Sequence, residues 1–596
     1  MANFIAVLDD DSERRARFER EVEPRLAIFD GLTRGACGAG NLRVLWAAGA
    51  RAPVRCMSSE DSVAIIWGDA MDGATGTRLD AEQLDRRWHA AEPYPEPLDG
   101  YHAALTYRDG QLTVGADILG LYPVYFADLG DILLVGSSPE LFRAHARFDG
   151  RRVNRIALAA IMLTMHLVND APLWQGSRRL APGHLLRRGR GGKVAEVEQY
   201  RVRPSHTWFD RPFSSHAAIL SGQLRETLRR HVPAGAHYGL MLSGGRDSRL
   251  LAGYMHERSL PVSALSLGLD GDLEIRCARA VAKALRFEHR VREIDQSRYA
   301  EYASRQVTWE HGAQGFNTIT GWGITPLASA MPAYMVNGYV GDSIIGGSHI
   351  HWARDRDTHE LSFETFFAQY NAYALSPRKA RALARKEVFR DAVDEVLEML
   401  RRCYRGYCDH EAGRAWCFDL YHRQRFHVGG ELWRLAFAAW PIAPFVDRRL
   451  IELCAGMPAS SLAERRVEDA VLCKDFPRLA ALPLERFTHD IMPLRPRVHH
   501  YIGDSIRRRL RWSPRGKERR RYHRIWDLNE PGWLAVRREA EKYRGLAYEW
   551  FDRKALDEVL PPPDVPIICD DQVTETSGLK TLLGLVLWMG ANTAAP

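Results

Sequence analysis

In the middle of this sequence, apolar strands alternate with helices, and few folds accommodate that order. The pattern is strand, helix, strand, helix, strand over residues 237–242, 249–255, 261–267, 274–285 and 287–294. Strands alternating with helices predict a parallel sheet covered by helices. In such sheets ligands bind beyond the carboxyl ends of the strands. The loop after residue 242 is therefore the first place to expect a site.

The first 205 residues have a different pattern. Residues 101–107 and 111–116 are apolar or alternating, and Asp109-Gly110 between them supplies a tight turn. A second such pair lies at 124–127 and 132–135, so we expect antiparallel sheet. A buried helix is expected over 156–167. We divide the chain into domains at 1–205 and 206–596, with a polar, proline-containing linker over 203–212.

The loop after residue 242 has the composition of a phosphate site. It reads Ser243-Gly244-Gly245-Arg246-Asp247-Ser248, between an apolar strand and a helix. Backbone N–H groups and the positive end of the helix dipole can converge there on an anion, and glycines permit close approach. An Asp beside phosphates makes sense mainly with a divalent cation between them. The loop lacks the Gly-Lys-Ser/Thr ending of a Walker A sequence.

This loop resembles the pyrophosphate loop of the ATP-pyrophosphatase superfamily, whose members split ATP between the α and β phosphates. A second segment, Asn337-Gly338-Tyr339-Val340-Gly341-Asp342-Ser343-Ile344-Ile345-Gly346-Gly347, resembles the G-E-G-x-D-E-x-x-G-G signature of asparagine synthetases. The resemblance implies that Asp247 and Asp342 hold Mg²⁺ against ATP. It implies an ATP and pyrophosphate site made of Ser243, Gly244, Gly245, Asp247, Ser248 and Gly338.

Further segments extend the resemblance in the same order along the chain. Residues 443–450 are similar to the P-F-L-D segment of asparagine synthetases, and residues 115–125, 137–141 and 174–186 resemble their N-terminal domain. The implied fold class is α/β. A Ntn-hydrolase-like αββα domain, a degenerate class II glutamine amidotransferase, precedes a parallel-sheet ATP-pyrophosphatase domain of the adenine nucleotide α-hydrolase-like type.

The chain departs from asparagine synthetases at three places. Glutamine-hydrolysing members carry a cysteine directly after the initiator Met, whereas this sequence has Ala2, so we expect no glutaminase activity. Tyr339 stands where asparagine synthetases have Glu. This resembles the β-lactam synthetases, in which a Tyr oriented by a Glu helps to deprotonate the amine. Glu431 is our candidate for that Glu, with a helix-capping or salt-bridge role as the alternative.

The third departure concerns a Lys that stabilises charge on the adenylate in the family. No Lys stands at the expected offset after Leu482-Pro483. Arg486, Lys474 or a residue of the long C-terminal extension could substitute, and the sequence leaves these alternatives open.

Four features together look most like lasso peptide cyclases, the macrolactam synthetases of ribosomal peptide biosynthesis: the inactive N-terminal domain, Tyr339 in place of Glu, the long insert between Gly347 and Pro444, and the Arg-rich C-terminal extension. The resemblance implies that the Asp or Glu side chain of a core peptide is adenylated and then attacked by the peptide's own α-amine, releasing AMP and pyrophosphate. It also implies a leader peptidase as partner protein. The alternatives are a β-lactam synthetase acting on a small β-amino acid and an asparagine synthetase-like enzyme using ammonia. An inactive scaffold, or a nucleic-acid-binding protein built on the basic residues 507–524, is the alternative from another class.

Composition limits the compartment and the partners. The nine cysteines lack the paired spacing of a structural zinc site, which suits a reducing cytoplasm. No apolar stretch is long enough to cross a bilayer, and we expect no membrane contact. The formal net charge of +7 favours an anionic ligand, but much of it lies within residues 507–524, which we read as a solvated face, and we expect no nucleic acid partner.

Overall fold

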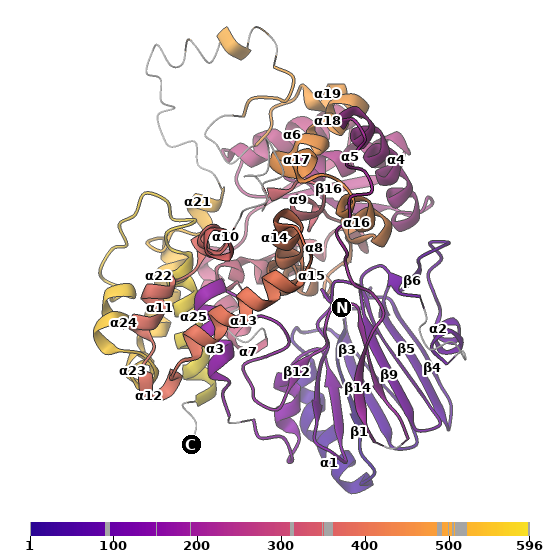
Figure 1. The fold of residues 1–596 in the computed structure, drawn as a ribbon, viewed down its shortest axis with the longest axis vertical. Helices are drawn as coiled ribbons and strands as arrows, with labels where there is room; N and C mark the ends of the chain where they lie inside the picture. The colour runs from indigo at the N-terminus through magenta and orange to yellow at the C-terminus, as the bar shows by residue number, and fades with distance from the viewer. Residues whose placement is uncertain are drawn as a thin grey trace.

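The protein contains three main β-sheets, and helices pack around them (Figure 1). The structure is a computed structural model. It describes residues 2–89, 96–150, 152–190, 192–309, 315–348, 350, 362–485, 491–496, 498, 500–502, 506 and 521–593.

The first part of the chain forms two six-stranded antiparallel sheets. One has the order β12 (Arg178–Arg179), β10 (Tyr125–Asp128), β11 (Leu133–Gly136), β1 (Ala2–Leu8), β3 (Leu42–Ala48), β2 (Thr33–Ala39). The other has the order β14 (Val194–Glu198), β13 (His184–Arg188), β9 (Gln111–Ala116), β8 (His102–Arg108), β5 (Ser62–Gly68), β4 (Val54–Ser58). A short ribbon pairs β6 (Met71–Asp72) with β7 (Leu98–Asp99). Helices of this part are α1 (Ser12–Val22), η1 (Glu23–Leu26), α2 (Ala81–Trp88), η2 (Pro139–Ala144) and α3 (Arg155–Thr164).

The two antiparallel sheets pack face to face and are covered by helices outside. Phe4 of β1 stacks on Trp67 of β5 at a centroid distance of 4.0 Å, which joins the inner faces. Trp88 of α2 is buried on the outer face of the second sheet, and Glu19 of α1 pairs with Arg43 of β3. The expected αββα order is confirmed.

Both expected hairpins are confirmed. β8 pairs with β9 across Asp109-Gly110, where both residues have positive φ, and β10 pairs with β11. The alternation in these strands buries one face of each sheet, and the turn residues set the register. Helix α3 is shorter than expected, because Met165 adopts a left-handed conformation that ends it.

The second part contains the expected parallel sheet. Its order is β17 (Glu288–Arg292), β16 (Val262–Leu267), β15 (Tyr238–Met241), β18 (Tyr334–Val336), β19 (Trp440–Ile442), and every pair is parallel. Helices α4 (Phe213–His231), α5 (Asp247–Glu257) and α6 (Leu273–Leu285) surround it. Both the sheet and the helix alternation predicted over residues 237–294 are confirmed.

Helices make up the remainder. Those before β19 are η3 (Gln296–Arg298), α7 (Tyr299–Trp309), η4 (Phe316–Gly323), α8 (Ile324–Ala328), α9 (Gly341–Ile344), α10 (Phe363–Tyr370), η6 (Asn371–Tyr373), α11 (Pro377–Leu383), α12 (Lys386–Phe389), α13 (Ala392–Gly406), α14 (Glu411–Asp419), the π-helix η7 (Leu420–Val428) and α15 (Gly429–Leu435). Those after it are η8 (Pro444–Val446), α16 (Arg448–Ala455), α17 (Ala459–Leu462), η9 (Ala463–Arg465), α18 (Arg466–Asp475), α19 (Pro477–Ala480), α21 (Arg521–Ile525), α22 (Pro531–Glu541), α23 (Arg544–Trp550), α24 (Arg553–Val559) and α25 (Ser577–Thr593). No helix among the described residues is long and apolar enough to cross a membrane.

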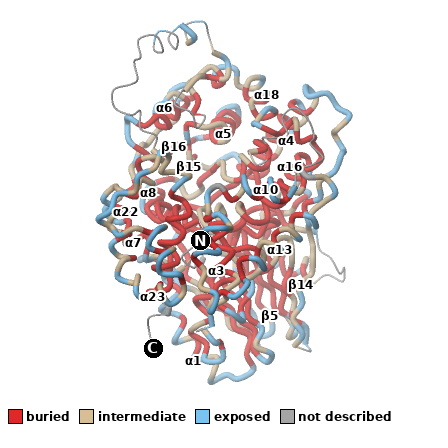
Figure 2. The backbone as a smooth tube through the Cα atoms, turned by 60° about the vertical axis from the view of Figure 1, so that its left-hand side comes forward, coloured by how far each residue is buried: buried red, intermediate tan, exposed pale blue. Residues whose placement is uncertain are grey.

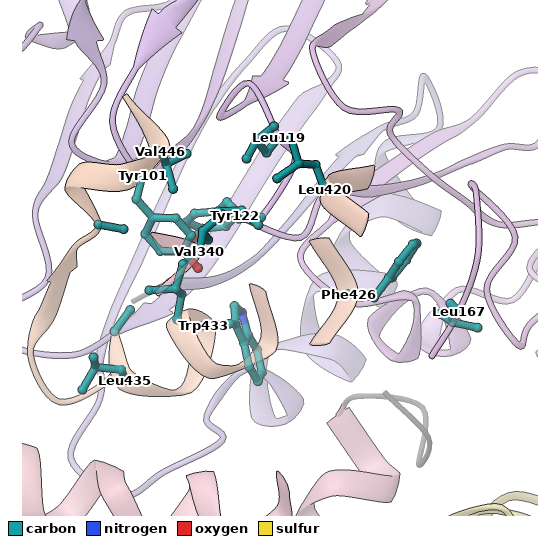
Figure 3. Packing of buried hydrophobic residues seen from close by; sticks show 14 of the residues in the cluster. Tyr101, Leu119, Tyr122, Leu167, Val340, Leu420, Phe426, Trp433, Leu435 and Val446 are labelled. Atoms are coloured by element: carbon teal, nitrogen blue, oxygen red, sulfur yellow. The ribbon is translucent and has the colours of Figure 1, made fainter. Parts of the chain in front are cut away.

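One hydrophobic core runs through both parts of the chain. Buried residues continue from the antiparallel sheets into the parallel sheet (Figure 2). In the close view of this core, Tyr101 and Tyr122 from the first part lie near Val340 and Val446 from the second (Figure 3). The loop that carries the second predicted motif is therefore anchored on the N-terminal part.

A buried ion cluster also joins the two parts. Arg230 of α4 lies 2.7 Å from Asp99 of β7 and 2.6 Å from Asp447, and His231 lies 3.0 Å from Asp447. Asp447 additionally caps α16 through the backbone of Leu450. The segment similar to P-F-L-D thus connects the two parts of the chain through this ion cluster.

Lys580 of α25 is fully buried. It forms no ion pair among the described residues. Its Nζ donates to the Gln572 carbonyl and the Thr576 hydroxyl, and lies 5.5 Å from the Trp533 ring centroid. Burial lowers the pKa of Lys580 to about 7.

This buried lysine predicts a pH-dependent stability. Between pH 7 and about 10.4 the unfolded chain binds this proton and the folded chain does not, so the free energy of unfolding should rise with pH. Lys580→Met should remove that part of the slope in urea unfolding measured at pH 7 and pH 9.5. The exposed Lys542→Met is the control and should keep it. An unchanged slope in Lys580→Met would contradict the assignment.

Candidate active site

The glycine-rich loop connects β15 to α5 and is closed by its own serines. Ser248 Oγ accepts a hydrogen bond from the Ser243 N–H at 3.0 Å and lies 2.8 Å from Ser243 Oγ. The Gly245 N–H donates to Ser243 Oγ at 3.2 Å. A Cβ at Gly244 would lie 2.9 Å from the Glu274 Cα, so only glycine fits there. The serines shape the loop in addition to offering hydroxyls.

Helix α5 begins inside this motif. We expected it from Arg249, whereas it begins at Asp247, so the Asp carboxyl stands in the first turn. Asp247 is thus placed at the positive end of the helix dipole.

The second motif forms another tight junction, from β18 into the short helix α9. Val340 has φ of 68°, a left-handed conformation that is strained for a β-branched residue. It is buried in the core shared with the N-terminal part, which holds it in place. Strain of this kind is concentrated at functional sites.

The two motifs touch each other. A Cβ at Gly341 would lie 2.5 Å from Asp247 Oδ1, and one at Gly338 would lie 2.9 Å from the Asp247 Cβ. Both glycines therefore allow the Asp247 side chain to lie against the backbone that leads into Asp342. Burial raises the pKa of Asp247, and the negative charge of Asp342 raises it further. The predicted residues of both loops meet at one place in the fold.

An arginine that the sequence did not indicate lies against this pair. Nη1 of Arg465 is 3.1 Å from both carboxylate oxygens of Asp247 and 2.8 Å from Glu468 Oε2. Its positive charge opposes the effect of burial on the Asp247 pKa. Burial and the charge of Asp247 raise the pKa of Glu468 to about 8. Positive charge is therefore needed to keep the carboxyl groups of Asp247 and Glu468 ionised.

The acids fit a magnesium ion that arrives with ATP. Asp247 and Asp342 offer carboxylate oxygens, and the Ser348 hydroxyl lies 3.4 Å from Asp342 Oδ2. Within the described part of the chain, no group of three or more His, Cys, Asp or Glu could hold a metal alone. Mg²⁺ commonly takes one or two carboxylates together with substrate phosphates. The donor set suits an ion shared with the nucleotide.

Tyr339 and Glu431 approach each other from different elements. Burial raises the pKa of Tyr339, and the charge of Glu431 raises it further. Glu431 lies on α15, and its Oε1 is 2.9 Å from Nη2 of the buried Arg434. No hydrogen bond joins Tyr339 and Glu431 within the described residues. Glu431 thus has the salt bridge that we gave as the alternative, while its charge also reaches Tyr339.

The C-terminal extension contributes to this region, which the sequence did not reveal. Tyr522 of α21 lies close enough to Glu431 and Tyr339 for their charges to interact. Arg524 pairs with Asp272 at 2.8 Å and also with Glu293, near the carboxyl ends of β16 and β17. Our reading of residues 507–524 as a solvated face is wrong for Arg524, which is buried. The carboxylates of Asp272 and Glu293 hold its guanidinium in this position.

Two residues were proposed as substitutes for the missing family lysine. Lys474 lies on α18, and Arg486 lies outside the described residues. Arg246, from the glycine-rich loop itself, pairs with Asp469 at 2.5 Å.

Comparisons with known proteins agree with this geometry. Residues 220–479 match the family model described as Asparagine synthase, which is less than half of the chain. The match includes both loops, and it supports an asparagine synthetase-like, ATP-dependent carbon–nitrogen ligase. A search of curated proteins finds no match.

Several solved structures resemble the chain weakly. "Structure of the allosteric regulatory enzyme of purine biosynthesis" is 10% identical with a TM-score of 0.23, over 49% of this chain and 80% of that one. The glutamine phosphoribosylpyrophosphate amidotransferase from B. subtilis, complexed with ADP and GMP, is 12% identical with a TM-score of 0.22, over 44% and 65%. The NMN synthetase from Francisella tularensis is 16% identical with a TM-score of 0.19, over 37% and 96%. Scores this low carry no argument about function.

Proposed function

We propose that the chain closes a macrolactam in a ribosomal peptide through an acyl-adenylate. The observation that carries the proposal is the contact between the glycine-rich loop and the Asp342 loop, with Tyr339 beside them. Adenylation needs phosphate binding next to acids that can share Mg²⁺, and amide formation needs a proton acceptor close by. The two loops offer the phosphate and metal sites, and Glu431 of α15, near Tyr339, offers the proton acceptor.

The first chemical step is adenylation. An oxygen of the peptide's Asp or Glu carboxylate attacks the α-phosphorus of ATP, and pyrophosphate leaves. Backbone N–H groups of the glycine-rich loop and the start of α5 would hold the phosphates. Mg²⁺ bound by Asp247 and Asp342 would neutralise phosphate charge. Arg465 would then keep Glu468 as its partner, at the distance of 2.8 Å already present.

The second step forms the amide. The peptide's α-amine attacks the acyl carbon, AMP leaves, and the amine loses a proton. Because the pKa of Tyr339 is raised, its hydroxyl stays protonated at neutral pH and serves as a relay. The Glu431 carboxylate is the group nearby that can take the proton from it. Holding amine and adenylate together replaces a bimolecular encounter by a positioned one.

Tyr339 supports an organic amine over ammonia, and the C-terminal extension beside it supports a large substrate. A leader peptidase that trims the precursor would act with this chain. We further propose that it works in a reducing, cytoplasmic setting, because all nine cysteines are free thiols in the structure.

Mass spectrometry of candidate substrates tests the proposal. Purified chain, MgATP and a core peptide should give a product that is lighter by one water, with one AMP for each ring. Small β-amino acids and ammonia with free carboxylic acids serve as comparison substrates. A ring formed only from a β-amino acid would make the enzyme a β-lactam synthetase instead. AMP formation with none of the three would overturn amide synthesis.

A further inference from the structure

One arginine near the reactive loops differs from the others in its pairing. Arg465 contacts Asp247 and Glu468, Arg246 contacts Asp469, and Arg434 contacts Glu431. Arg423, on the π-helix η7, has no ion pair and no side-chain hydrogen bond among the described residues. Its positive charge is therefore not committed to a protein partner there.

The π-helix brings Arg423 to the Asp342 loop. The neighbouring Gln424 donates from Nε2 to the Ser343 Oγ at 2.6 Å, and Ser343 directly follows Asp342. Gln424 and Ser343 both bind Asp419 Oδ2, at 2.8 and 2.6 Å, so η7 and the loop are tied together. π-Helices are rare and frequently occur at functional sites.

The surroundings favour a charged guanidinium. Burial alone would lower the pKa of Arg423, but the charges of Asp419 and Asp342 raise it above its usual value. Asp419 is already occupied by Gln424 and Ser343. Arg423 as a whole residue is half-buried.

We infer that Arg423 binds the phosphate chain of the nucleotide beside Asp342, opposite the glycine-rich loop. A guanidinium matches phosphate oxygens in two parallel hydrogen bonds and stays charged at all working pH values. It supplies the cation that the sequence lacks after Leu482-Pro483. The inference rests on the proposed function in one respect, namely that ATP binds between the two loops.

Binding measurements on the full chain test this role. Dissociation constants for Mg²⁺-pyrophosphate and for adenosine are measured by calorimetry for the wild type, Arg423→Gln, Arg423→Lys and Arg402→Gln. Arg402 is an exposed residue of α13 and gives a matched loss of charge. We expect Arg423→Gln to bind pyrophosphate about 10- to 100-fold more weakly, and Arg423→Lys to be intermediate. Adenosine binding and the Arg402→Gln variant should stay unchanged.

Three other outcomes would overturn the inference. Pyrophosphate binding within twofold of the wild type in Arg423→Gln would overturn the role of Arg423 and leave the proposed function intact. Proportional loss of adenosine and pyrophosphate affinity would show a structural role. If Arg423→Gln does not fold, the loss of pyrophosphate affinity relative to adenosine affinity in Arg423→Lys decides instead. A wild type that binds neither pyrophosphate nor MgATP would overturn this inference and the proposed function together.

Discussion

Asp342→Asn should lower ATP–pyrophosphate exchange by about 10³-fold or more. The amide keeps the size of the side chain and its place at the start of α9, but removes one of the two carboxylate charges beside the phosphates. The remaining acid, Asp247, lies against the same backbone and is already paired with Arg465, so one carboxylate charge is left where two were present. Exchange of radiolabelled pyrophosphate into ATP, in the presence of peptide, measures the effect.

Asp270→Asn is the matched control. This residue belongs to the same domain and is largely exposed, and its one ion pair among the described residues is with Arg279 at 2.6 Å. It should exchange at the wild-type rate. Undiminished exchange in Asp342→Asn would remove the metal assignment, and raising the Mg²⁺ concentration should restore part of the lost rate if the assignment holds.

Local patterns predicted the parts of the fold that local physics decides. The hairpin around Asp109-Gly110 and the strand-to-helix junction at residues 242–247 follow from turn chemistry and periodicity. The glycine-rich loop was predicted from its place between a strand and a helix, and the Asp342 loop from its resemblance to the asparagine synthetase signature. These signals act within a few residues, so a single sequence carries them.

Contacts across long separations could not be predicted in this way. Arg465 reaches Asp247 across 218 positions, and Tyr522 returns to Glu431 from the C-terminal extension. Nothing near either residue marks its partner. Val340 is a second case, since a β-branched residue gives no local sign of a left-handed backbone. Val340 lies near Tyr101 and Tyr122 in the core, which are distant in the sequence.

The π-helix was missed for a related reason. We made no prediction for residues 420–428, since no residue type signals the wider turn. Gln424 and Asp419 both bind Ser343, about 80 positions away. Arg423 lies on this π-helix, and no motif in the sequence marks it as a candidate phosphate ligand.

Tyr339→Phe should slow amide formation by about 10²- to 10⁴-fold while leaving pyrophosphate exchange near the wild-type rate. The ring keeps its packing, but without the hydroxyl no relay connects the amine to Glu431. Single-turnover experiments with preformed adenylate separate the two steps. Tyr334→Phe, five positions earlier on β18, removes a hydroxyl outside the site and should affect neither. Equal loss in both steps would place Tyr339 in nucleotide binding.

Glu431→Gln distinguishes a relay from a lone tyrosine. If Tyr339 passes the proton to Glu431, the amide variant should lose a similar factor in ring closure, and the double variant should lose little more than either alone. Independent, multiplying losses would mean that the two groups act separately. Because Arg434 pairs with Glu431, unfolding of Glu431→Gln must be compared with the wild type to exclude a general loss of structure. A relay requires normal folding, normal exchange and slow ring closure in all three variants.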